Sequence, residues 1–282
     1  MIICRDAGHT PEINRCTRYV RAMRGNADPL FARRASSFGM HAAAYAEHRP
    51  DYPMAGIRWA LAGAAHAPAR VLDLGAGTGK LTAGLLTLGL ETIAVEPDPA
   101  MRAELNRRLP AVSVLDGTAE EIPLSPGSVD AVVVGQAFHW FDHNAALTEI
   151  ARVLRPGGVV GALWNRDDTD VEWVAEVARL SRNDILRGRA SRDGTLPAHP
   201  AFEEFEQGTF PHSQRRTADS LTATIGTHSH VIVAPEPERA ELLARVRDYL
   251  RSRPETGNGE FDLPIHTTVL RARVRVPFED QA

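Results

Sequence analysis

A turn that contains three glycines is the part of the chain best suited to chemistry. Residues 71–80 read Val-Leu-Asp-Leu-Gly-Ala-Gly-Thr-Gly-Lys, a short apolar run that continues through Gly75, Gly77 and Gly79. A strand that turns sharply through glycines into a helix brings backbone N–H groups close to a ligand, because no Cβ atom stands in the way. The segment therefore predicts a ligand-binding turn between a strand and a helix.

The spacing of these glycines separates three classes of ligand. A phosphate-binding loop needs Gly-x-x-x-x-Gly-Lys-Ser/Thr, but Leu74 stands five residues before Gly79, and Leu81 follows Lys80. A dinucleotide loop needs Gly-x-Gly-x-x-Gly. Counted from Gly75, its third glycine position is Lys80, whose long side chain would obstruct close helix–strand packing. The order of residues instead suits a ligand with an amino-acid moiety.

An amino-acid moiety carries an ammonium and a carboxylate, and the turn offers a partner for each. The acid at the strand end and the glycine carbonyls can hold the ammonium, while the N-terminus of the following helix tolerates the carboxylate. The residues that we expect to contact this ligand are Asp73, Gly75, Ala76, Gly77 and Thr78.

Short apolar segments alternate with helical patterns over the middle of the chain. Strands separated by helices in this way indicate a parallel sheet covered on both faces. With right-handed crossovers, we expect a doubly wound, Rossmann-like α/β fold whose ligands bind at the carboxyl ends of the strands. The expected strands are residues 70–74, 92–96, 112–115, 129–134 and 159–163, and the expected helices include 99–108 and 144–154.

The C-terminal hundred residues are less regular. Helical patterns cover residues 172–187 and 237–253, and residues 266–276 alternate between apolar and polar side chains. This alternation predicts a last strand that closes the sheet in the antiparallel direction. We expect residues 35–282 to form a single domain.

Composition and charge exclude several classes of protein. The 282 residues are 43% hydrophobic and 24% charged, which is ordinary for a globular protein with a core. A net charge of −4 gives no field that attracts nucleic acid, and no apolar run approaches the length of a membrane helix. The first residues lack the apolar stretch of a secretory signal. We therefore expect a cytoplasmic protein that binds neither nucleic acid nor membrane.

The N-terminal stretch, residues 1–34, is basic, with seven arginines against three acids and no regular period. We expect it to be a flexible extension, either solvated or bound to an acidic partner. Cys4 and Cys16 both lie in this stretch. Two thiols there support neither a disulfide framework nor a four-ligand zinc site, and we expect no bound metal.

The glycine turn resembles motif I of the class I S-adenosylmethionine-dependent methyltransferases, and the resemblance continues along the chain. Glu96 ends the second expected strand, 21 residues beyond Gly75. A carboxylate there can accept hydrogen bonds from a ribose diol, and the family uses its acid in this way. The resemblance also places Pro97 beside the cofactor and Met101 against its adenine, although a methionine on a helix fits core packing equally well.

Residues 117–124, Gly-Thr-Ala-Glu-Glu-Ile-Pro-Leu, are similar to the family's Gly-Asp-Ala-Glu-x-Leu-Pro-Phe segment, which contacts adenine. The resemblance implies that Thr118, Ala119 and Glu120 border the adenine. The Thr118 hydroxyl replaces the usual carboxylate and is a weaker acceptor. Residues 152–158, Arg-Val-Leu-Arg-Pro-Gly-Gly, match the family's turn before the fifth strand and are interpreted as structural.

Residues 136–141, Gln-Ala-Phe-His-Trp-Phe, resemble a variant found in small-molecule methyltransferases related to trans-aconitate methyltransferase. That subgroup also has an N-terminal element matched here by Phe38, Tyr45, Arg49, Pro50, Tyr52 and Pro53. The resemblance implies that Tyr45 and Arg49 cap the cofactor, with Arg49 near its carboxylate, and that Gln136 also contacts the cofactor.

The methyl acceptor is expected beside Phe138, His139, Trp140 and Trp164. His139 is a candidate general base, and a hydrogen-bonded pocket wall is the alternative. An aromatic face near a sulfonium is favourable by about 0.5–2 kcal/mol, although core packing explains Trp140 and Trp164 equally well.

The function predicted from these features is transfer of a methyl group from S-adenosylmethionine to an O, N or S atom of a small molecule. Residues 55–165 would bind the cofactor, and residues 166–282 would supply the acceptor side. A non-catalytic, cofactor-binding regulatory module is one alternative. A nicotinamide-dependent oxidoreductase is another, against which Lys80 speaks. The sequence leaves the acceptor and the oligomeric state open.

Overall fold

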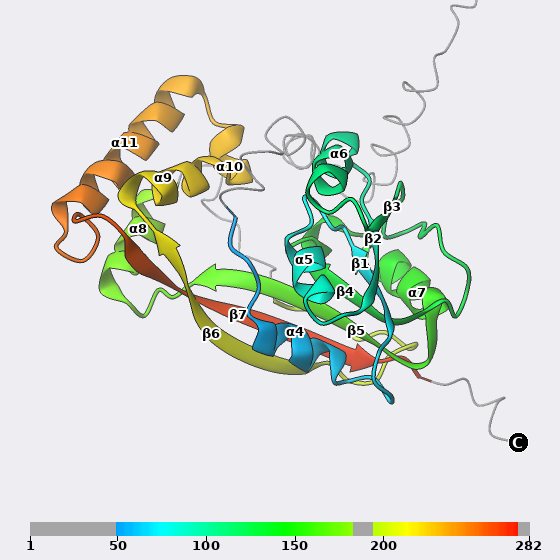
Figure 1. The fold of residues 1–282 in the computed structure, drawn as a ribbon. Helices are drawn as coiled ribbons and strands as arrows, with labels where there is room; N and C mark the ends of the chain where they lie inside the picture. Colours follow the sequence, from blue (N-terminus) through cyan, green and yellow to red (C-terminus); the bar gives the residue numbers. More distant parts are fainter. Residues whose placement is uncertain (1–48, 183–193, 276–282) are drawn as a thin grey trace, which may run out of the picture.

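One mixed β-sheet is the frame of the molecule (Figure 1). The structure, a computed structural model, describes residues 49–182 and 194–275. The strand order is β3-β2-β1-β4-β5-β7-β6. Strands β1 to β5 pair in parallel, whereas β7 is antiparallel to both β5 and β6. The order reverses between β1 and β4, and the carboxyl ends of parallel strands form a ligand crevice at such a point.

The strands of the described residues are β1 (Arg70–Leu74), β2 (Glu91–Val95), β3 (Ser113–Leu115), β4 (Val129–Gly135), β5 (Leu154–Asp167), β6 (Glu206–Arg216) and β7 (Phe261–Arg273). The helices are α4 (Met54–Leu61), α5 (Lys80–Leu86), α6 (Pro99–Arg108), the 3₁₀ turn η3 (Phe138–Trp140), α7 (His143–Val153), α8 (Glu172–Leu180), α9 (Ala218–Gly226), α10 (Ser229–Ile232) and α11 (Glu236–Ser252).

This arrangement confirms the doubly wound, mostly parallel sheet and its antiparallel closing strand. The closing strand covers Phe261–Arg273, so it begins five residues before the predicted start at residue 266. The helix expected at residues 172–187 ends at Leu180, and residues 183–193 lie outside the described residues. The sequence does not predict β6, which pairs with β7 along its whole length.

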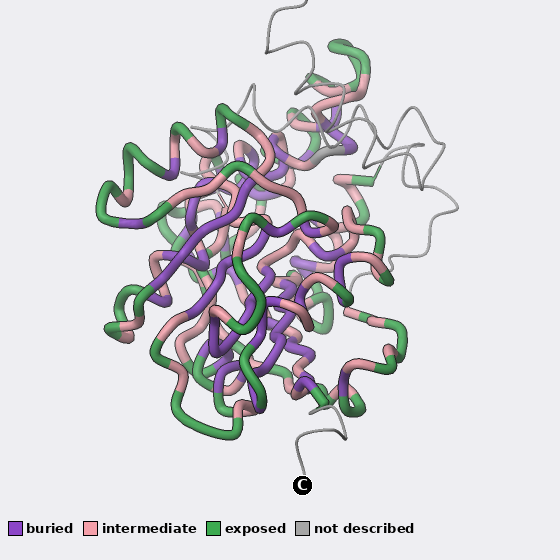
Figure 2. The backbone as a smooth tube through the Cα atoms, turned by 90° about the vertical axis from the view of Figure 1, so that its right-hand side faces the viewer, coloured by how far each residue is buried: buried purple, intermediate pink, exposed green. Residues whose placement is uncertain are grey.

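The two faces of the sheet are covered by different elements. On one face, α4 and α5 pack on alternate residues of β1, β4 and β5, such as Val71, Ala131 and Val159. On the other face, α7 packs on the intervening residues, such as Leu72 and Val132. Because successive strand residues point to opposite faces, strands that are apolar throughout require cover on both sides. Figure 2 shows the buried backbone running through the middle of the molecule, with exposed loops around it.

A second hydrophobic cluster lies apart from the sheet core. Helices α8, α9, α10 and α11 contribute Val177, Leu221, Val231 and Leu250 to it, among others. The start of β7 joins them through Phe261, Leu263 and Ile265. In Figure 1 these helices gather at one end of the long strands β5, β6 and β7, beyond α4 and α5. We call this group of helices the helical cap.

Some of the predicted features lie in parts of the chain that the structure does not describe. The basic extension at residues 1–34, both cysteines and Tyr45 lie outside the described residues. Among the residues that are described, no helix is both long enough and apolar enough to cross a membrane.

The sheet core predicts how two leucines in helices will differ. Leu147 in α7 is fully buried against the sheet, whereas Leu86 at the end of α5 is 36% exposed. Leu147→Ala should lower the free energy of unfolding by about 2–5 kcal/mol, because it leaves a cavity in the core. The matched control, Leu86→Ala, should change it by less than about 0.5 kcal/mol. Urea unfolding of both variants tests this packing, and equal effects would contradict it.

Candidate active site

The turn after β1 has the backbone that its glycines predict. Gly75, Gly77 and Gly79 have φ angles of +69°, +57° and +86°, in the left-handed region that favours glycine. The N–H groups of Gly75 and Ala76 donate to the carbonyl of Val95, at 2.8 and 3.2 Å, which fixes the turn to the end of β2. A Cβ atom at Gly75 would lie 2.8 Å from the Cβ of Ala137, so a side chain there would not fit. Gly77, in contrast, borders open space.

Asp73 is a buried carboxylate beneath this turn. Its Oδ2 accepts a hydrogen bond of 2.5 Å from the Thr82 hydroxyl of α5. Its Oδ1 and the Thr78 hydroxyl are both buried without a hydrogen-bond partner within the described residues. Burial raises the pKa of Asp73 to about 7, against the lowering effect of the hydrogen bonds from Thr82. The turn thus holds two buried oxygen atoms that are available to a ligand.

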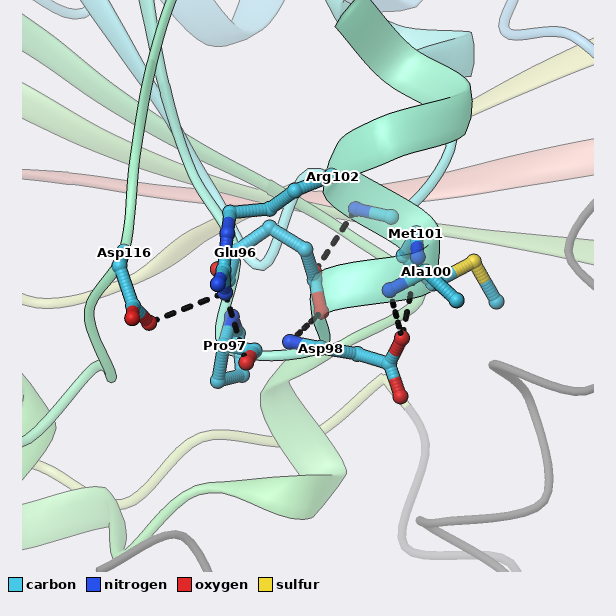
Figure 3. Close-up of polar contacts among 8 residues, drawn as sticks. Glu96, Pro97, Asp98, Ala100, Met101, Arg102 and Asp116 are labelled. Carbon is cyan, nitrogen blue, oxygen red and sulfur yellow. Dashed lines mark hydrogen bonds and ion pairs between the residues drawn. The ribbon is translucent and has the colours of Figure 1, made fainter. Parts of the chain in front are cut away.

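Glu96 follows β2 and connects two turns. Its Oε2 accepts from the N–H of Gly77 and its Oε1 from the N–H of Asp98, both at 2.9 Å. The residue is only 7% exposed, and burial raises its pKa to about 7. Figure 3 shows this carboxylate beside the start of α6, where the Asp98 side chain caps the helix by accepting from Ala100 and Met101.

Arg102 supports the same corner from α6. It donates to the backbone carbonyls of Glu96 and Pro97 and pairs with Asp116 at 2.9 Å (Figure 3). Met101 is 3% exposed but still borders the cavity described below, and its contact with adenine stays a prediction.

A cavity of about 700 Å³ opens at the carboxyl ends of the parallel strands. Its near side, beside the glycine turn and the start of α6, contains residues predicted for the cofactor: Gly75, Gly77, Glu96, Pro97, Met101, Thr118, Ala119, Glu120 and Gln136. Arg49, also predicted for the cofactor, lines the cavity from beside the end of α9, where its Nη2 donates to the carbonyl of Thr227 at 3.2 Å. A smaller cavity, of about 40 Å³, shares several of these residues and is also lined by Asp73, Ala76 and Thr78. The structure therefore brings together every predicted cofactor residue except Tyr45, which is outside the described residues.

Gln136 lies at the point where the strand order reverses. Among the described residues other than glycine, Gln136 alone has a positive φ angle, +54°. This backbone conformation is strained for a residue with a side chain. Its side chain donates to the carbonyl of Asn165 at 2.8 Å, and its N–H donates to the carbonyl of Leu163. These bonds hold Gln136 at the ends of β4 and β5, where it lines both cavities.

Asn165 has no counterpart in the sequence prediction, yet it connects several segments at the site. Its Nδ2 donates to the carbonyl of Asp51, and its Oδ1 accepts from the buried hydroxyl of Thr267. Asp51 in turn pairs with Lys80 at 2.9 Å, at the start of α5. A polar residue just after the apolar run of residues 159–163 is the signal that would have pointed to Asn165.

The residues predicted for the acceptor divide into two groups. His139 and Trp140 line the large cavity, with their ring centroids 4.7 Å apart. Phe138 and Trp164 do not line it, because both are almost fully buried in the sheet core. The predicted end of this strand at residue 163, just before Trp164, is wrong, since β5 continues to Asp167 and Trp164 pairs with Thr268 inside it.

The far side of the cavity comes from elements that the sequence leaves unassigned. It includes Gln214 and Arg216 at the end of β6, and residues of α9, α10 and β7. The cavity thus runs from the glycine turn into the helical cap.

Comparisons with known proteins agree with this geometry. A family model described as a methyltransferase domain matches residues 72–161. An uncharacterized methyltransferase of Mycobacterium bovis is 42% identical over 237 residues, which span 84% of this chain and 95% of the relative. An uncharacterized methyltransferase of Schizosaccharomyces pombe is 31% identical over 227 residues, or 79% of this chain and 90% of the relative.

A solved structure of a candidate type II methyltransferase from Anaeromyxobacter dehalogenans shares the fold with a TM-score of 0.63 at 30% identity. The match covers 80% of this chain and 97% of that protein. The chain therefore belongs to the class I S-adenosylmethionine-dependent methyltransferases. The narrower resemblance to the trans-aconitate methyltransferase subgroup stays a prediction.

Membership in this family implies the use of S-adenosylmethionine, and the residues present fit it. Asp73 and Thr78 keep buried oxygen atoms without partners, Gly77 leaves open space, and the Glu96 carboxylate lines the cavity. These are the features that an ammonium, a close backbone approach and a ribose diol require.

The buried acid of Asp73 makes stability depend on pH. Unfolded Asp73 ionises near pH 3.8, whereas the folded residue keeps its proton up to about pH 7. Its contribution to the free energy of unfolding should therefore fall as the pH rises from about 4 to about 7. Asp73→Asn removes this pH-dependent contribution. The free energy of unfolding of the variant, relative to that of the parent protein, should therefore be higher at about pH 8 than at about pH 5.

Urea unfolding of the ligand-free parent protein and variant at about pH 5 and about pH 8 measures this difference. Asp248→Asn is the matched control, because Asp248 is an exposed acid on α11. A stability difference between Asp73→Asn and the parent that does not change with pH would contradict the prediction.

Proposed function

We propose that this protein transfers a methyl group from S-adenosylmethionine to an O, N or S atom of a small molecule. The observation that carries the proposal is the large cavity, which joins the glycine turn and Glu96 on one side to the helical cap on the other. Its volume, about 700 Å³, lies in the range typical of small-molecule sites.

The residues that would hold the cofactor follow from their chemistry. Asp73 and the carbonyls of the turn would hold the ammonium, Arg49 the carboxylate, and Glu96 the ribose hydroxyls. Met101, Thr118, Ala119 and Glu120 would border the adenine. This assignment is supported by the shared lining of the two cavities.

When bound, S-adenosylmethionine supplies a methyl group already activated by a sulfonium sulfur. The protein then has to orient an acceptor atom within about 3–3.5 Å of that carbon and to exclude water. Gln136, fixed between β4 and β5, and His139 and Trp140 of η3 would form the wall against which the acceptor is oriented. His139 would accept a proton from a hydroxyl or amine acceptor.

The cofactor assignment predicts the effect of Glu96→Gln. Loss of the charged acceptor should weaken binding of S-adenosylmethionine or its demethylated by-product by about 10–100-fold, because hydrogen bonds to charged groups contribute about 1.5–3 kcal/mol. Calorimetric titration and ligand-induced thermal shifts would measure this loss.

Glu91→Gln is the control for this variant, since Glu91 begins the strand that Glu96 follows, is exposed and pairs with Arg70 at 2.9 Å. Its cofactor affinity should match that of the parent protein. The absence of any shift for the parent protein with millimolar cofactor would reject the proposed function.

The proposed base predicts that His139→Ala lowers turnover by about a hundredfold or more, with little change in cofactor affinity. Turnover is measured by mass spectrometry of labelled products, after a metabolite extract is incubated with deuterated-methyl cofactor. His199→Ala is the control, because His199 lies outside the cavity, near Thr148. Unaltered turnover in His139→Ala would leave His139 a wall residue. Cofactor binding without any labelled product would favour a regulatory module instead.

A further inference from the structure

Charges are unevenly distributed along the cavity. Its near side carries the acids Glu96, Asp98 and Glu120. The far side, built by the end of β5, β6, β7 and the helical cap, carries Arg166 and Arg216 together with three histidines, His228, His230 and His266. Among the described residues that line the far side, Asp167 is the acid. Among the described residues of the far side, arginines outnumber acids, and imidazoles lie beside them.

Arg216 is the more deeply buried of the two arginines on the far side. It is the last residue of β6, pairs with Phe261 of β7 and is only 6% exposed. One guanidinium nitrogen donates to the Gln214 side chain at 2.6 Å, and both side chains line the cavity. A guanidinium group remains charged in a protein, so burial imposes a cost that nearby negative charge must offset.

Asp167 is the acid that acts most strongly on Arg216. It faces the cavity, where the surrounding protein raises its pKa while the nearby Arg49 and Arg216 lower it. Two guanidinium groups thus act on a single carboxylate. Asp51, the other acid that influences Arg216, is already paired with Lys80.

The histidines of the helical cap supply hydrogen-bonding groups beside these arginines. The rings of His228 and His230 lie 5.6 Å apart. Burial, Arg49 and His230 hold the pKa of His228 well below its usual range, so His228 is a neutral imidazole that can donate or accept a hydrogen bond. His230 contacts the carbonyl of Ser181 through its Nε2, at 3.1 Å.

We infer that the far side of the cavity binds an anionic group of the methyl acceptor, a carboxylate or a phosphate, and that Arg216 is the residue that selects it. A planar guanidinium can donate two parallel hydrogen bonds to either group. The bound anion would place a further negative charge beside the guanidinium group that lines the cavity. This inference rests on the proposed function, because it names the class of acceptor for the same cavity.

Three small aromatic probes test the inference on the full chain saturated with the demethylated cofactor by-product. Benzoate carries a carboxylate, phenyl phosphate a phosphate, and benzamide is the neutral counterpart of benzoate. Ligand-observed NMR titration should show at least one anion binding about tenfold or more tightly than benzamide. The anion that binds more tightly distinguishes a carboxylate from a phosphate site.

Variants assign the selectivity to Arg216. Arg216→Gln should lower the affinity for the preferred anion about tenfold or more, while Arg216→Lys should retain part of it. Arg215→Gln is the matched control, because the neighbouring Arg215 is exposed and pairs with Glu260 and Asp262. It should leave anion binding unchanged.

The inference would be overturned if benzamide binds as tightly as both anions, or if none of the three probes binds. It would also be overturned if Arg216→Gln and Arg215→Gln have equal affinities for the preferred anion. The comparison of the three probes needs only the parent protein, so it tests the preference for an anion even if a variant does not fold. Titration of the same proteins with the cofactor by-product keeps this outcome separate from the proposed function, because Arg216→Gln should bind it within about twofold of the parent protein.

Discussion

The site depends on one buried carboxylate that ties two turns together. Glu96 accepts hydrogen bonds from Gly77 in the turn after β1 and from Asp98 at the start of α6. Because the carbonyl of Val95 also receives the N–H groups of Gly75 and Ala76, the ends of β1 and β2 are fixed against each other at consecutive residues. This fixed corner is pre-organised for a ligand, since little backbone has to be ordered when the ligand binds.

The parallel half of the fold could be predicted from sequence because its signals are local. The strands of this half have short apolar runs, the glycines stand where the chain turns left-handed, and Pro99 begins a helix that Asp98 caps. The predicted limits of β1 and α6 agree with those observed, and all predicted cofactor residues in the described part of the chain line the two cavities.

The antiparallel half could not be predicted as well, because its order comes from partners distant in the sequence. Strand β6 contains Pro211 and mostly polar or half-buried residues, which an edge strand tolerates. Its register is set by β7, some fifty residues later in the chain. The role of Arg216 depends on that pairing and on Asp167 of β5, so nothing in its neighbouring residues indicates it. Trp164 illustrates the reverse case, in which a β5 longer than expected buries a residue predicted for the pocket.

The helical cap has its own hydrophobic cluster, separate from those that hold the parallel strands. Substitutions in α8 to α11 therefore alter one cluster without disturbing the packing under the glycine turn. Such a division allows an ancestral enzyme to acquire new acceptors through changes in the cap while it retains the same methyl donor. Lineages of this fold should accordingly diverge fastest in α8 to α11 and slowest between β1 and β4.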